Sequence, residues 1–317
     1  MALPKILQDL SVPVVGAPMF IVSTPDLVIA QCKAGIVGSF PALNARPASQ
    51  LGEWIRRIKA ELAAHDAAHP EQKSAPFAVN QIVHRSNTRL EEDLRTCVEH
   101  QVPIMITSLG ARTDVYEAAH SYGGIVLHDV INQTFAHKAI DKGADGLILV
   151  AAGAGGHAGT TSPFALVQET RAWFEGPILL SGCIATGGAV LAAQAMGADL
   201  AYVGSAFIAT EEANAPPEYK QMIVDSSADD IIYSDRFSGV KGNYLKPSLV
   251  RAGLDPDALA EVEVSHVDFG RADGAKAWKD IWGSGQGIGA VTQVVPTGER
   301  VARIREEYLA ARARLVG

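Results

Sequence analysis

Cysteine is scarce in this sequence, and the three cysteines that it has lie far apart. Cys32, Cys97 and Cys183 form neither a metal-binding pair nor a disulfide framework. This usage is typical of a reducing cytoplasm, where we expect the protein to be located. The sequence also lacks the basic and apolar regions of a signal peptide, and it lacks any run of about 18 apolar residues. We therefore expect neither export nor a membrane partner.

Positive charge is also in short supply. Lys and Arg together number 27 against 35 for Asp and Glu, which gives a net charge of −8. No basic cluster is long enough to follow a phosphate backbone, so we expect no nucleic-acid partner. The sequence contains no GxSxG, HExxH or CxxC motif and no GxxxxGKS or GxxxxGKT motif. These absences argue against a hydrolase nucleophile, a bound metal and a nucleoside triphosphate site.

Short apolar segments recur through the first two thirds of the chain, and each ends in small or polar residues. They are VPVVGAPM (12–19), GIVGSF (35–40), FAVNQIV (77–83), IMITSLG (104–110), IVLHDV (125–130), GLILVAAG (146–153), PILLSGC (177–183) and LAYVGSAF (200–207). Several are apolar almost throughout, as expected for parallel strands that are buried on both faces.

Helical patterns separate most of these segments, which indicates repeated parallel strand–helix units. Eight such units predict an α/β fold, a TIM (β/α)8 barrel over residues 1–207, with a doubly wound sheet as the alternative. Residues 208–290 differ in pattern, with short amphipathic segments and many residues that break helices and strands. We expect a small, mainly helical cap there without a buried strand. Residues 291–317 contain a final helix that we expect to pack back on the barrel.

The active face of such a barrel lies at the carboxyl ends of its strands. The segments that we expect to be the seventh and eighth strands end in SGCIATGG and VGSAF, where barrels commonly hold a phosphate with backbone N–H groups. Ser181, Gly182, Gly204 and Ser205 are therefore candidate phosphate ligands. The other interpretation is that these glycines serve only tight turns.

His157 stands alone as a titratable side chain within VAAGAGGHAG, where glycine and alanine leave room for a bulky ligand. We interpret it as a general base or as a group that orients an anion, against the alternative of a loop histidine bonded to backbone groups. His128 and Asp129 are adjacent in a strand, so only one of them can face inward. The glycine-rich GSGQGIG (283–289) reads as a lid or a contact loop from the cap.

Several motifs together resemble those of the nitronate monooxygenase family, also called the 2-nitropropane dioxygenase family. They are GAPM, FAVN, KGADGLILVAAGAGGHAG and ILLSGCIATGGAVLAAQAMGADLAYVGSAFIATEE, with WGSGQGIG near the C-terminus. The resemblance implies an FMN-binding barrel with Met19 beside the flavin ring, Asn80 in contact with it, and Gly155 and Gly156 beneath it. It also implies that the candidate phosphate ligands hold the FMN phosphate and that His157 is catalytic.

The reaction implied by this resemblance is the oxidation of an alkyl nitronate, or of a nitroalkane, by O2 to a carbonyl compound and nitrite. A flavoenzyme that uses NAD(P)H to reduce a quinone, an enoyl thioester or another acyl-CoA is the alternative, and a flavin-binding protein without catalysis is a third. A homodimer is one assembly compatible with the sequence. The sequence departs from the family pattern in two places. Asp129 stands where many relatives have lysine, and Val150 to Ala152 stand where many have glutamine or an acidic residue.

Overall fold

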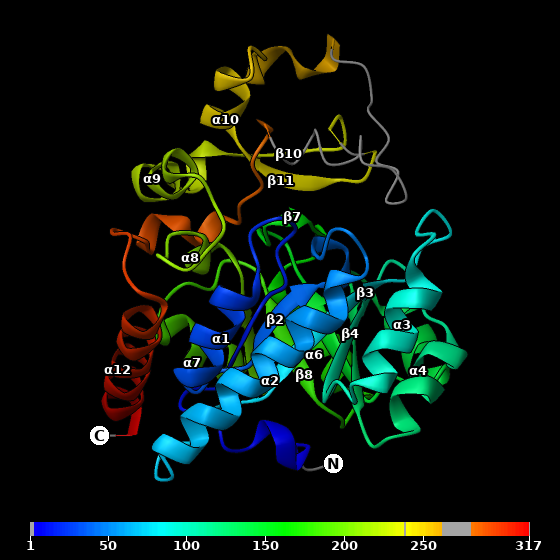
Figure 1. The fold of residues 1–317 in the computed structure, drawn as a ribbon. Helices are drawn as coiled ribbons and strands as arrows, with labels where there is room; N and C mark the ends of the chain where they lie inside the picture. Colours follow the sequence, from blue (N-terminus) through cyan, green and yellow to red (C-terminus); the bar gives the residue numbers. More distant parts are fainter. Residues whose placement is uncertain (1–2, 238, 262–279, 317) are drawn as a thin grey trace.

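Eight parallel strands form the centre of the molecule. The computed structural model describes residues 3–237, 239–261 and 280–316 (Figure 1). The strands are β1 (Val14–Gly16), β2 (Gly38–Pro41), β3 (Phe77–Ile82), β4 (Ile104–Ser108), β5 (Ile125–Val130), β6 (Gly146–Val150), β8 (Ile178–Ser181) and β9 (Leu200–Val203). They pair in the order β1-β9-β8-β6-β5-β4-β3-β2. A parallel bridge from Val15 to Val37, directly before β2, brings the two end strands together, so the expected TIM barrel is confirmed.

Helices follow the strands and surround the barrel. They are α1 (Pro25–Lys33), α2 (Gln50–Ala68), α3 (Leu90–Glu99), α4 (Thr113–His120), α5 (Gln133–Asp141), α6 (Pro163–Arg171) and α7 (Gly187–Met196), with short 3-10 turns η1 (Lys5–Leu7) and η2 (Ala42–Asn44). The last helix, α12 (Thr297–Val316), packs against α7 and α1 and completes the ring (Figure 1). Among the described residues, no helix is both long enough and apolar enough to cross a bilayer.

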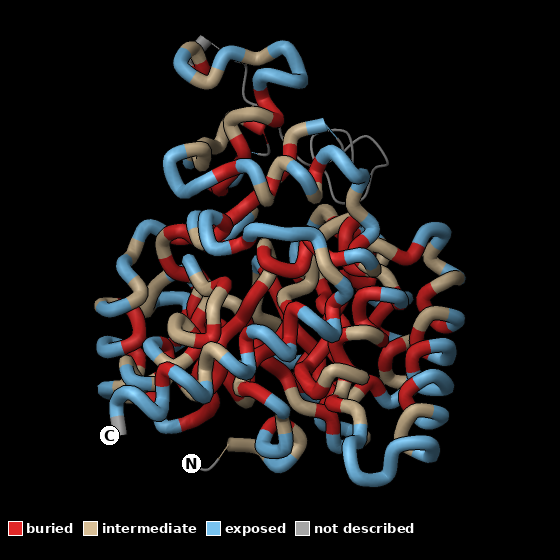
Figure 2. Tube along the Cα trace, turned by 90° about the vertical axis from the view of Figure 1, so that its left-hand side faces the viewer, coloured by how far each residue is buried: buried red, intermediate tan, exposed pale blue. Residues whose placement is uncertain are grey.

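The strands are apolar because both of their faces are covered. Ile104 and Ile106 of β4 belong to the cluster inside the barrel, whereas Met105 between them packs outward with Val115 and Tyr116 of α4. Side chains alternate across a strand, so two buried faces require an almost unbroken apolar run. Figure 2 shows the buried positions concentrated in the barrel.

A cap covers the mouth of the barrel (Figure 1). The short helix α8 (Ser205–Ile208) leads from β9 toward the cap, whose described elements are α9 (Pro217–Asp225), η3 (Ala228–Asp230), β10 (Ile231–Ser234), β11 (Gly242–Leu245), α10 (Lys246–Arg251), η4 (Pro256–Glu261) and η6 (Gln286–Ala290). Most are helical, as expected. The cap boundaries at 208 and 290 stay a prediction, and residues 262–279 of this segment lie outside the described residues.

The cap nevertheless contains strands, so the expectation of no buried strand there was wrong. β10 and β11 form an antiparallel pair, and β11 continues onto β7 (Gly156–His157), which belongs to the barrel loop. All four residues of β11 are buried. Its sequence, Gly-Asn-Tyr-Leu, has no apolar run. The strand is buried because the cap covers one side of it and a glycine loop covers the other.

The two ends of the cap segment leave the barrel side by side. A bridge joins Thr210 to Val295, and the Glu211 N–H donates to the Val295 carbonyl at 3.1 Å. The Glu212 carboxylate accepts from the Thr297 N–H at 2.8 Å and from the Thr297 hydroxyl at 2.7 Å. A carboxylate at this position caps the start of α12 and favours its helix dipole.

The contact between α7 and α12 depends on a glycine. A Cβ on Gly187 would overlap the Ile304 carbonyl and the Tyr308 N–H of α12, whereas a Cβ on Gly188 would have no such neighbour. We expect Gly187→Ala to lower the free energy of unfolding by about 1 to 3 kcal/mol, since backbone must move to admit the methyl group. Gly188→Ala is the matched control and should leave stability unchanged or raise it slightly. Urea denaturation measures both, and equal stabilities would contradict this packing.

Candidate functional site

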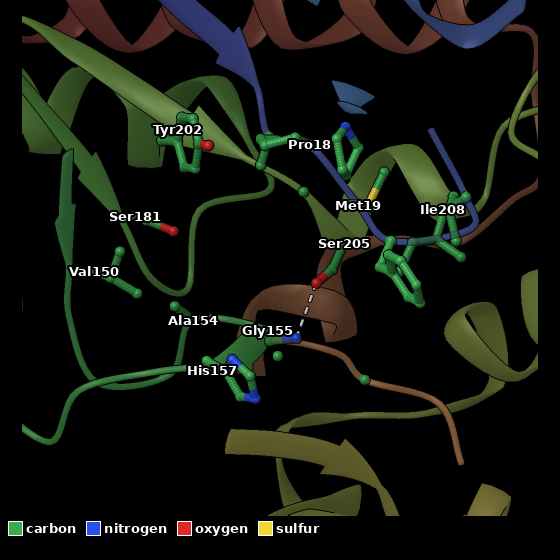
Figure 3. A pocket seen from close by; sticks show the side chains of 18 of the residues that line it. Pro18, Met19, Val150, Ala154, Gly155, His157, Ser181, Tyr202, Ser205 and Ile208 are labelled. Carbon is green, nitrogen blue, oxygen red and sulfur yellow. Dashed lines mark hydrogen bonds between the residues drawn. The ribbon is translucent and has the colours of Figure 1, made fainter. Parts of the chain in front are cut away.

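A cavity of about 330 Å³ lies between the carboxyl ends of the strands and the cap. A volume of this size suits a cofactor or a small ligand. The structure brings all the candidate residues to its wall, namely Met19, Asn80, Gly155, Gly156, His157, Ser181, Gly182, Gly204 and Ser205. Figure 3 shows His157, Ser181 and Ser205 around this space, with Met19 opposite His157.

The floor of the cavity is backbone packed against backbone. A Cβ on Gly285 would lie 2.7 Å from the Gly153 carbonyl oxygen and 2.9 Å from the Gly155 nitrogen. The Gln286 N–H donates to the Gly153 carbonyl at 2.9 Å, and the Gly285 N–H donates to Ser205 Oγ at 2.8 Å (Figure 3). The glycine-rich segment 283–289 is therefore a contact loop that lies on VAAGAGGHAG.

The candidate phosphate ligands meet at the ends of two neighbouring strands. Ser181 pairs in register with Tyr202, so Gly182 and Gly204 leave the sheet next to each other. Gly182 has a φ of +130°, a conformation that a side chain would strain. No Lys or Arg is present among the described residues that line the cavity. An anion at this end would therefore be held by backbone N–H groups and hydroxyls rather than by a cationic side chain.

His157 is held where the barrel loop meets the cap. It pairs with Gly242 of β11. On one side of it, the Asn243 amide donates to the Ala154 carbonyl at 2.7 Å, and on the other the Tyr233 hydroxyl donates to the Ala158 carbonyl at 2.8 Å. Burial lowers the pKa of His157 to about 4, because the charged ring would lose its solvation. The imidazole is therefore neutral at pH 7 and able to accept a proton.

Asp129 faces the cavity, and His128 faces away, as the alternation of side chains requires. His128 Nδ1 lies 2.7 Å from the Thr107 hydroxyl and 3.0 Å from the Tyr116 hydroxyl, between the sheet and α4. Asp129 accepts a hydrogen bond from the Ser108 hydroxyl. Burial raises the pKa of Asp129 to about 6, although its hydrogen bonds oppose this shift.

Sequence reasoning missed several residues of the wall. Ser108 is the polar last residue of the apolar strand β4, and it could have been noted as Asn80 was, a polar residue within the apolar strand β3. Tyr219 of α9 and Trp282 also line the cavity, and their rings stack at 4.6 Å with an interplanar angle of 12°. The Tyr219 hydroxyl donates to the Gly283 carbonyl at 2.5 Å. No local pattern marks Tyr219, because its position depends on how the cap folds over the barrel.

The geometry defines a (β/α)8-barrel protein with a capped ligand cavity at the carboxyl ends of its strands. Solved structures share this fold. A nitroalkane oxidase from Streptomyces ansochromogenes aligns with a TM-score of 0.80 at 23% identity, over 96% of this chain and 97% of that one. FabK from Thermotoga maritima aligns with a TM-score of 0.78 at 23% identity, over 99% of this chain and 97% of that one.

Sequence comparison then gives the family. The profile of the nitronate monooxygenase family matches residues 4–307, so the chain belongs to that family, which consists of flavin-dependent oxidoreductases. A nitronate monooxygenase of Paraburkholderia phytofirmans is 26% identical over 93% of this chain and 92% of its own length. A Mycobacterium tuberculosis protein described as a putative monooxygenase is 29% identical over an alignment that covers 50% of this chain and 43% of that protein.

Two glycines of the contact loop provide a test of the floor. Gly285→Ala would place a methyl group against the backbone of Gly153 and Gly155, whereas the nearest atoms to a Cβ on Gly289 are 3.8 Å away. We expect Gly285→Ala to cost about 1 to 3 kcal/mol of unfolding free energy, because the facing backbone has no side chain that can yield. Gly289→Ala should cost little. Thermal unfolding of both variants checks this, and a Gly285→Ala protein as stable as Gly289→Ala would refute the close contact.

Proposed function

We propose that this chain is an FMN-dependent nitronate monooxygenase that oxidises alkyl nitronates, and nitroalkanes, with O2 to carbonyl compounds and nitrite. The observation that carries the proposal is the position of His157, which β11 holds on the wall of the same cavity as the glycine floor and the ends of β8 and β9. Bound FMN would supply the electron-transfer chemistry between substrate and oxygen. The residues of the protein then have to bind the substrate, orient it and remove its α-proton.

The wall of the cavity fits FMN. Gly182 and Gly204 provide close backbone approach at one end, beside the hydroxyls of Ser181 and Ser205, and this donor set suits a phosphate. Gly155 and Gly156 would lie under the ring, with Met19 and Asn80 in contact with it. A Cβ on Gly155 would come within 2.7 Å of the Gly285 nitrogen and within 3.0 Å of Ser205 Oγ, so Gly155 allows the close contact between the two loops that shapes this wall.

The rest of the wall suits an alkyl substrate. Phe20 and Ile21 come from the loop after β1, and Leu109 and Ile131 lie at the open side, where each is 39% exposed. Apolar side chains at the mouth favour an alkyl group over a polar one. The neutral His157 can take the α-proton of a nitroalkane.

Several further expectations from the sequence stay predictions. They are the cytoplasmic location, the homodimer, O2 as the second substrate and the absence of a nucleic-acid partner.

His157 variants test the catalytic assignment. We expect His157→Ala and His157→Asn to keep FMN and to lose about 10² or more in the rate of nitroalkane oxidation, the scale of a lost general base. Nitrite release measures the rate, and the flavin absorbance of the purified protein measures retention of the cofactor. Full turnover by both variants with FMN bound would remove His157 from the mechanism.

The choice of electron donor separates the proposal from the reductase alternative. We expect propyl-2-nitronate and O2 to yield nitrite without NAD(P)H, and we expect NADH or NADPH to leave the flavin absorbance unchanged under anaerobic conditions. Rapid anaerobic bleaching by either nicotinamide would favour a reductase of quinones, enoyl thioesters or other acyl-CoA compounds. A protein that binds flavin but shows no turnover with any of these donors would support the non-catalytic alternative.

A further inference from the structure

One corner of the cavity is built from three polar side chains on neighbouring strands. Asn80 is on β3, Ser108 on β4 and Asp129 on β5, and all three line the cavity. The Asn80 amide nitrogen lies 2.8 Å from Ser108 Oγ, and the Ser108 hydroxyl donates to Asp129. The three groups therefore form one hydrogen-bonded chain that ends at a carboxylate.

The direction of this chain is fixed at both ends. The Asn80 amide nitrogen also lies 3.3 Å from the Ile106 carbonyl, which can only accept. An ionised Asp129 can likewise only accept, so the single Ser108 proton goes to it, and Ser108 must accept from Asn80. Both amide protons of Asn80 are thus used, and its Oδ1 makes no hydrogen bond with the residues that the structure describes. Because Asn80 lines the cavity, this oxygen remains to accept a hydrogen bond from a ligand.

The groups that face Asp129 do not neutralise it. The Leu109 N–H donates to it. Burial raises the pKa of Tyr202 of β9 and of Tyr116 of α4, and the nearby charge of Asp129 raises both further. His157 shares the cavity, and burial lowers its pKa, while His128 points to the other side of the sheet. No Lys or Arg lines the cavity among the described residues. This corner therefore presents hydrogen-bond acceptors with net negative charge above about pH 6, where Asp129 ionises.

We propose that Asp129 is a positioning residue that acts through Ser108 to hold Asn80 Oδ1 toward the cavity, so that the corner selects a ring with an N–H donor. The proposal rests on the assignment of FMN as the cofactor, since the isoalloxazine ring carries one such imide N–H. Hydrogen bonds in a chain polarise one another, so the carboxylate also strengthens Asn80 as an acceptor. Protonation of Asp129 removes the anchor and weakens the selection.

The test compares FMN with 3-methyl-FMN, in which the imide N–H is blocked. Both flavins are titrated into the full-length protein freed of flavin, from pH 5 to pH 7.5, and flavin fluorescence gives the two Kd values. The phosphate titrates equally in both ligands, so the ratio of the Kd values reports on the ring alone. We expect the wild type to prefer FMN about tenfold at pH 7.5, the effect of one unpaired acceptor, and less as the pH falls through about 6.

The variants separate positioning from a general effect of charge. Asp129→Asn should reduce the preference to about twofold or threefold and make it independent of pH. Ser108→Ala, which keeps the carboxylate but breaks the chain, should also abolish the pH dependence. Asp9→Asn, an exposed carboxylate, is the matched control and should behave as the wild type.

Two results would overturn the inference. One is a wild-type preference for FMN over 3-methyl-FMN that does not change from pH 5 to 7.5. This result does not depend on whether any variant folds. The other is the same pH-dependent preference in Asp129→Asn and in the wild type. A wild-type protein that binds neither flavin would instead refute the cofactor assignment, and the inference with it. Nitrite release without any preference between the flavins would leave the proposed function standing and remove the role of Asp129.

Discussion

The contact between two glycine segments, one from the barrel and one from the cap, is the constraint on which the rest of the site depends. Gly153 and Gly155 lie against Gly285 so closely that no Cβ fits between them, and Ser205 is joined to the same loop by a hydrogen bond. Interiors elsewhere are filled by interlocking side chains that can adjust. Here the distance between cap and barrel is set by main-chain atoms, so the cavity above them has a fixed floor.

Burial acts in the same sense on two titratable side chains of the cavity, His157 and Asp129. Burial lowers the pKa of His157 to about 4 and raises that of Asp129 to about 6, so in each case it favours the uncharged form. At pH 7 the histidine is neutral and the carboxylate carries the charge. Among the described residues that line the cavity, the carboxylate of Asp129 has no Lys or Arg beside it.

The barrel could be predicted from the sequence because a strand buried on both faces leaves a run of apolar residues, as Ile104, Met105 and Ile106 do. The candidate site residues could be found because strand ends converge in this fold. The strand β11 could not, since its burial comes from the cap and the glycine loop around it rather than from its own composition. Tyr219 is similar, because its place in the wall depends on a stack with Trp282, which is distant in the chain.

The paired ends of the cap segment have a consequence for how this architecture varies. Since Thr210 and Val295 are bridged and α12 resumes the ring directly afterwards, everything between them is an insertion into the last strand–helix unit. An insertion whose ends lie together is tolerated by its host, and the entropic cost of closing it grows only slowly with its length. The cap can therefore vary in length away from β11 and residues 283–289, which contact the barrel, without any rebuilding of the sheet.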